Sequence, residues 1–134
     1  MNEFDHITTD AAVKTYDASR AVFTALLAEV RELSKKKPEA TLSAGKVRII
    51  NRVLQDLLTI LKGEPEGKYL DELDDDALPQ VSDALLIMVQ FEAAANAFFR
   101  RYYQRVYGEH YWITNELLAE WEAADGETDE ESED

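Results

Sequence analysis

Apolar residues recur at intervals of three, four and seven over most of this chain. In the first run, Tyr16, Phe23 and Val30 stand seven residues apart, with further apolar residues at the intermediate spacings. Such spacing gathers apolar side chains on one face of an α-helix, whereas a half-buried strand would need strict alternation. The pattern predicts a first helix that begins near Thr8 and ends before Pro38, which cannot continue a helix.

Three more segments carry the same periodicity. A second helix is predicted from near Ser43 to Gly63 and a third from Pro79 to Gly108, because proline suits a helix start and glycine a helix end. A shorter fourth helix is predicted from Ile113 to Ala124, and almost no segment alternates as a strand would. The predicted fold class is therefore all-α: an antiparallel helical bundle of three long helices plus a short fourth.

The middle of the third predicted helix is apolar on every side between Leu85 and Val89, which is typical of the centre of a core. We therefore expect Leu86 and Met88 to be buried, together with Leu54 on the main apolar stripe of the second helix. Glu92 is an acid within the third helix. It is expected either to face solvent or to pair with an arginine.

The charge of the chain is strongly negative and unevenly distributed. Acids outnumber bases 28 to 14, giving a net charge of −14. The residues from Asp125 to Asp134 include seven acids and no base, so they cannot bury apolar area, and we expect a disordered acidic C-terminal tail after a single domain at 1–124. This balance disfavours binding to nucleic acid through a wide basic face and binding to anionic membranes.

The residue types present disfavour several chemistries. The chain has no cysteine, which removes disulfides, thiolate metal sites and cysteine nucleophiles. His6 follows Glu3 by three residues, but no glutamate stands three residues before His110, whereas di-metal helical bundles require two such pairs. The acids Asp74–Asp76 lack the glycine and glutamate spacing of a calcium-binding loop and are interpreted as acids at the start of the third helix. We expect no metal ion and no cofactor.

Hydropathy and the first residues of the chain bear on its location. No apolar run approaches the roughly 20 residues that a membrane span needs. The residues Met1–Asp5 are acidic and polar, unlike a signal or transit peptide. The sequence therefore predicts a soluble cytoplasmic protein with no membrane contact.

Arginines alternate with aromatic residues between Phe98 and Trp112. Three interpretations are open: core packing with arginines paired to acids, a protein interface, or a surface on which nucleotides stack. Arginine, tyrosine and tryptophan are the residue types that most often anchor protein interfaces. The candidate binding residues are Arg100, Arg101, Tyr103, Arg105, Tyr107 and Trp112.

Within this segment, Arg105 is followed after four residues by His110. This spacing resembles the motif of the HEPN family, small all-helical domains of which many are metal-independent ribonucleases that act as dimers. The resemblance implies that Arg105 would stabilise phosphate charge and that His110 would move a proton near neutral pH. That family usually has a polar residue after the arginine, and Val106 departs from this pattern.

The function that the sequence favours is a non-enzymatic protein–protein interaction module. A small acidic regulator, an antitoxin or immunity-type neutraliser, or an accessory subunit of a larger complex would fit. The alternatives are the HEPN-like ribonuclease and an acidic protein that imitates nucleic acid. The expected partner is another protein, such as a basic one, in a homodimer or a hetero-complex whose contacts centre on Phe99, Tyr103 and Tyr107.

Overall fold

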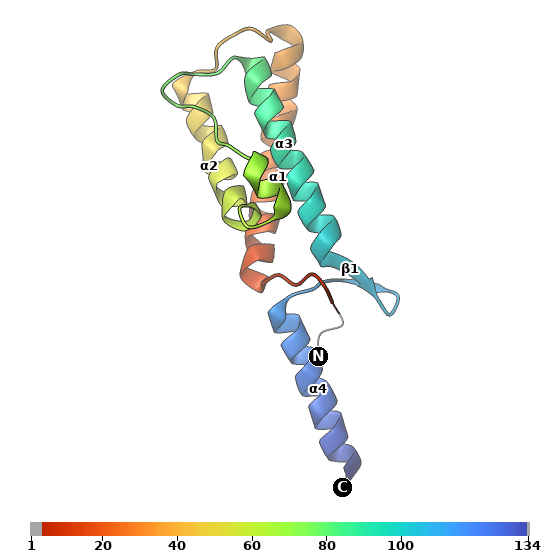
Figure 1. Cartoon of the computed structure of the whole chain (residues 1–134). Helices are drawn as coiled ribbons and strands as arrows, with labels where there is room; N and C mark the ends of the chain where they lie inside the picture. The colour runs from red at the N-terminus through yellow and green to blue at the C-terminus, as the bar shows by residue number, and fades with distance from the viewer. Residues whose placement is uncertain (1–3, 134) are drawn as a thin grey trace. The chain divides into compact units, whose positions relative to one another are not determined.

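The computed structural model describes residues 4–133, with side chains to Gly126, and is mostly helical (Figure 1). Its elements divide between two compact units. One unit is Thr15–Phe98, and the other combines Met1–Lys14 with Phe99–Asp134. In chain order the elements are α1 (Asp10–Lys36), α2 (Ala44–Leu61), a 3-10 helix η1 (Pro65–Tyr69), α3 (Val81–Tyr102), β1 (Tyr103–Val106), β2 (Glu109–Trp112) and α4 (Asn115–Glu133).

The two helices predicted first lie where the sequence places them. α1 ends at Lys36, two residues before Pro38. α2 begins after Ser43, whose hydroxyl accepts a hydrogen bond from the Lys46 N–H at 3.2 Å and so caps the helix. The helical fold class is confirmed at this level, because both helices follow the 3.6-residue apolar period.

The core of the Thr15–Phe98 unit confirms two of the three burial predictions. Leu54 and Met88 are fully buried, but Leu86 is 62% exposed. An α-helix turns 100° per residue, so Leu86 lies about 200° from Met88 and faces the other way. The fully buried side chains of this core include Phe23, Leu27, Val47, Leu54, Leu57, Leu61, Ala84, Met88, Phe91, Ala95 and Phe98.

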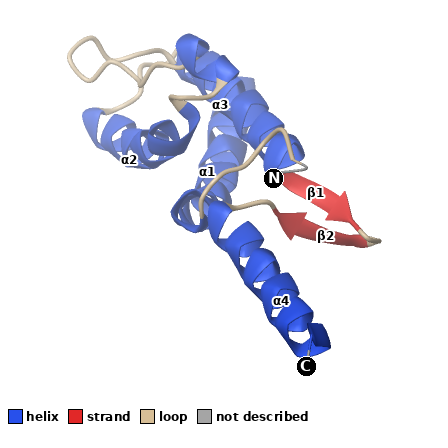
Figure 2. Cartoon of the chain, turned by 60° about the horizontal axis from the view of Figure 1, so that its bottom comes forward, coloured by secondary structure: helices blue, strands red, loops and turns tan. Residues whose placement is uncertain are grey.

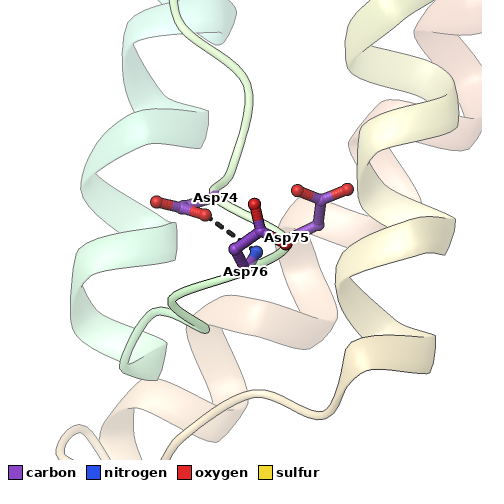
Figure 3. A group of neighbouring side chains, drawn as sticks. All are labelled: Asp74, Asp75 and Asp76. Carbon is purple, nitrogen blue, oxygen red and sulfur yellow. Dashed lines mark hydrogen bonds between the residues drawn. The ribbon is translucent and has the colours of Figure 1, made fainter.

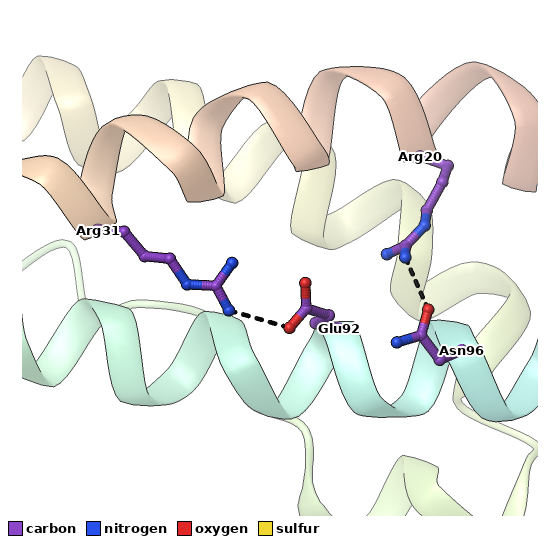
Figure 4. A network of polar contacts seen from close by, with 4 residues as sticks. All are labelled: Arg20, Arg31, Glu92 and Asn96. Atoms are coloured by element: carbon purple, nitrogen blue, oxygen red, sulfur yellow. Dashed lines mark hydrogen bonds and ion pairs between the residues drawn. The ribbon is translucent and has the colours of Figure 1, made fainter.

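Polar side chains connect α1 to α3 at the edge of this core (Figure 4). The Arg31 guanidinium forms an ion pair with the Glu92 carboxylate at 3.0 Å. Arg20 donates to the amide oxygen of Asn96 at 2.7 Å. The prediction that Glu92 pairs with an arginine is confirmed.

A buried amide helps to hold the connection between α2 and α3 to the core. Asn51 of α2 donates to the Leu73 carbonyl at 2.9 Å and accepts from the Leu73 N–H at 2.9 Å. Leu70 and Leu73 are buried beside it. Gly67 is required in η1, because a Cβ there would lie 2.5 Å from the backbone oxygens of Leu61 and Lys62.

A β-hairpin replaces the predicted second half of the third helix (Figure 2). α3 ends at Tyr102, not at Gly108, and β1 and β2 pair antiparallel. Tyr107 and Gly108 form the two-residue turn with φ of 51° and 85°. Positive φ at both positions is the signature of a type I′ turn, whose twist matches that of paired strands. The prediction that the third helix continues to Gly108 is wrong, because aromatic and β-branched residues pair well as strands once such a turn forms.

The last helix is longer than predicted. α4 begins at Asn115 and continues to Glu133, whereas the sequence predicted an end near Ala124 and a disordered tail from Asp125. The Thr114 hydroxyl caps its start by accepting from the Leu117 N–H at 3.0 Å. No proline interrupts the segment, and glutamate is a good helix former. The side chains from residue 127 onward lie outside the described residues.

α3 also corrects the expectation from hydropathy. With 22 residues it is long and apolar enough to cross a membrane, by length and composition alone. One face of α3 is nevertheless buried against the other helices of its unit, including Ala84, Met88 and Phe91. The apolar window of α3 is 39% buried, so part of its apolar surface stays uncovered.

Candidate binding surface

The hairpin sorts the predicted site residues by the alternation of its strands. Tyr103 pairs with Trp112 and Arg105 with His110. Because successive strand residues point to opposite faces and cross-strand partners share a face, these four side chains lie on one side of the hairpin. The residues between them lie on the other side.

Three rings on this side, Tyr103, His110 and Trp112, form a continuous network with Phe99 from the last turn of α3. Phe99 stacks on Tyr103 with ring centroids 4.8 Å apart and meets the edge of Trp112 at 5.5 Å. Tyr103 also stacks on His110 at 5.5 Å and lies 5.4 Å from Trp112. Offset and edge-to-face arrangements at these distances are favourable between aromatic rings.

Several of these side chains reach solvent. Phe99 is 39% exposed, and Tyr107 at the tip of the hairpin is 95% exposed. His110 and Arg105 are exposed, while Tyr103 and Trp112 are half-buried. We call the set Phe99, Tyr103, Arg105, Tyr107, His110 and Trp112 the hairpin surface.

An open depression of about 310 Å³ borders the hairpin surface. Three rings of that surface line it together with Tyr111 and Thr114, and α4 and the first residue of α1 contribute the rest. Two carboxylates, Asp10 and Glu120, line it as well, and both residues are exposed. The complete lining is Asp10, Tyr103, His110, Tyr111, Trp112, Thr114, Leu117 and Glu120.

The segment before α1 brings Asp10 to this depression. The Thr8 N–H donates to the Ile113 carbonyl at 2.9 Å, and the Thr8 carbonyl accepts from the Asn115 N–H at 3.0 Å. The Asp10 N–H then donates to the Glu116 carboxylate at 3.1 Å. These bonds fix the start of α1 beside the start of α4, so the Asp10 carboxylate is placed by backbone contacts.

The opposite side of the hairpin is tied to α4. The Tyr111 hydroxyl donates to the Glu109 carboxylate at 2.6 Å, which raises the pKa of Tyr111. The Tyr111 ring meets the edge of Trp121 at 5.2 Å. The ring contact with Trp121 joins the hairpin to α4, whereas the hydroxyl bond lies within β2, because Glu109 belongs to the same strand.

The structure places the six candidate binding residues differently from one another. Tyr103, Arg105 and Trp112 come together on one face, and Tyr107 stands at its tip. Arg100 is exposed on α3, and Arg101 is half-buried with its carbonyl accepting from Gln104 at 2.8 Å. Sequence reasoning missed Asp10 and Glu120, because only the fold brings these distant segments to the same depression.

The acidic loop before α3 is a turn of its own (Figure 3). The Asp74 carboxylate accepts from the Asp76 N–H at 2.8 Å and from the Ala77 N–H at 3.0 Å. These two bonds lower the pKa of Asp74. These acids, interpreted as a cluster at the N-terminus of the third helix, precede that helix, because α3 begins at Val81, five residues after Asp76. The three aspartates are exposed and their carboxylates lie within 4.8 Å of one another.

No family model, curated protein or solved structure matches the chain.

Proposed function

We propose that this protein is a non-enzymatic interaction module that binds another protein through the hairpin surface. The observation that carries the proposal is the accessible ring network of Phe99, Tyr103, His110 and Trp112. Interfaces are enriched in aromatic residues and arginine at their anchors. Arg105 lies on the same face, so this surface combines both kinds of anchor.

The turn supports the same proposal. Tyr107 adopts a φ of 51°, which is unfavourable for a residue with a side chain, and its own side chain is 95% exposed. A side chain this exposed adds little packing to the fold, and asparagine or glycine would adopt this backbone conformation with less strain. Strain held at an exposed aromatic side chain favours a role in contacts outside the chain.

Replacing Tyr107 with asparagine separates these two roles. We expect Tyr107→Asn to raise the free energy of unfolding by about 0.5–1 kcal/mol, because Asn-Gly is the preferred type I′ turn. The same substitution removes an exposed aromatic anchor, so association should weaken. Thermal denaturation measures the first effect and light scattering the second. If Tyr107→Asn is less stable than the wild type and associates to the same extent, the role given to Tyr107 is contradicted.

The proposal as a whole is tested with a surface variant, Phe99→Ser with Tyr103→Ser. We expect this double variant to lose an association that the wild type shows. The association is either self-association in light scattering or binding of a protein that co-purifies with the wild type from native cells. Leu86→Ser is the matched control, because Leu86 is exposed on α3 in the other unit. If the surface variant and the wild type behave alike in both assays, the hairpin surface is not the binding site.

The second candidate is the HEPN-like ribonuclease. The register places Arg105 directly opposite His110, so the two residues of the resemblance share one exposed face. The carboxylates of Asp10 and Glu120 beside His110 oppose the approach of a phosphate backbone. Labelled RNA incubated with wild type, Arg105→Ala and His110→Ala decides the matter. Metal-independent cleavage that both variants lose would replace the interaction proposal.

A further inference from the structure

The depression beside the hairpin has the chemistry of a cation site. Its lining combines the aromatic rings of Tyr103 and Trp112 with the carboxylates of Asp10 and Glu120, which supply negative charge. Organic cations bind aromatic faces and carboxylates together. At about 310 Å³ the depression lies at the lower limit for small-molecule sites, which suits one side chain better than a larger ligand.

Among cationic side chains, arginine fits this combination best. Its planar guanidinium stacks on a ring while its N–H groups donate in pairs to a carboxylate. Lysine offers a compact charge with neither property. The depression is therefore best matched by an arginine presented by a neighbouring protein surface.

The chain carries such an arginine next to the depression. Arg105 is exposed and pairs across the hairpin with His110, which lines the depression. In an interface with two-fold symmetry, both copies use the same patch. The patch must therefore contain both the arginine and the site that binds it, so that each copy's arginine reaches the other copy's site. The hairpin surface with its depression meets this requirement.

We propose that the partner is a second copy of this chain, with Arg105 of each copy held by the aromatic and acidic depression of the other. This inference rests on the proposed function of the hairpin surface and adds the identity of the partner. Each copy carries a net charge of −14, so the two copies repel at long range. At about 0.15 M salt such repulsion is screened beyond roughly 8 Å, whereas the close contacts in the interface are screened much less.

Charge exchange tests the pairing. In 0.15 M sodium chloride, we expect Arg105→Glu and Glu120→Arg each to raise the dimer dissociation constant by about a hundredfold, because each places like charges together. An equimolar mixture of the two variants should recover a dimer, since both contacts of the mixed pair again join opposite charges. Sedimentation velocity of each variant and of the mixture measures this.

The matched control is Glu122→Arg, which changes an exposed acid on the same helix that does not line the depression. It should leave the dissociation constant within about twofold of wild type. Circular dichroism checks that each variant is folded. If a charge-reversal variant does not fold, the neutral change at the same position, Arg105→Gln or Glu120→Gln, takes its place. Those neutral variants should also weaken the dimer.

Other outcomes overturn the inference in distinguishable ways. A wild type that stays monomeric up to high micromolar concentration removes the second copy as partner, yet leaves the hairpin surface free to bind another protein. A dimer that neither charge change weakens, or a mixture that does not recover, removes the Arg105 contact. A dimer that also survives Phe99→Ser with Tyr103→Ser removes the proposed function itself.

Discussion

Leu54→Ala is expected to lower the free energy of unfolding by about 2–5 kcal/mol. Leu54 is fully buried in α2, so its truncation loses the transfer free energy of the removed atoms and leaves a cavity. A domain of this size has about 5–15 kcal/mol in total, so the loss is a large share of its stability. Urea denaturation followed by circular dichroism measures it.

The same substitution at Leu86 is the control. Leu86 is 62% exposed on α3, so Leu86→Ala should change the free energy of unfolding by no more than about 0.5 kcal/mol. Equal losses at the two positions would mean that the apolar centre of α3 is covered on both faces. That result would overturn the assignment of its buried face.

Asn51→Ala is expected to cost about 2–4 kcal/mol, through hydrogen bonds rather than packing. The substitution leaves the buried N–H and carbonyl of Leu73 without their side-chain partner, and each unsatisfied buried group costs about 1–3 kcal/mol. The connection between α2 and α3 should also open more readily. Denaturation gives the free energy, and limited proteolysis between residues 62 and 80 reports the opening.

Gln55→Ala, one helical turn along the same helix, is the comparison for Asn51. Gln55 is exposed and donates to Glu72 at 3.2 Å, so water can replace its partner. The loss there should stay within about 0.5 kcal/mol. If Asn51→Ala and Gln55→Ala cost the same, the amide of Asn51 does not hold the connection.

The sequence predicts the helices well where one period governs a long run. Tyr16, Phe23 and Val30 are buried along α1 as their spacing indicates, and Pro38 and Ser43 mark real boundaries. Leu86 shows the limit of the same argument. A segment that is apolar on every side does not reveal which face packs inward, and only the neighbouring helices decide that.

The hairpin could not be predicted from local pattern. The turn Tyr107–Gly108 lacks the Asn-Gly or Asp-Gly pair that marks a type I′ turn, and the aromatic residues before it continue a helical spacing. The sequence therefore indicates only part of the candidate site. Residue type alone points to Tyr103, Arg105 and Trp112. Asp10 and Glu120 belong to distant segments that only the fold brings together.

Hydrogen–deuterium exchange at two protein concentrations tests most directly whether the hairpin surface is an interface between copies. Between about 1 μM and 200 μM, we expect slower exchange at amides of β1, β2 and the first turns of α4, with little change in α2. The Arg105→Glu variant should show no such concentration dependence. Two results would contradict an interface at the hairpin surface. One is slower exchange in α3 around Leu86 in place of the hairpin, and the other is unchanged exchange at all amides of the hairpin.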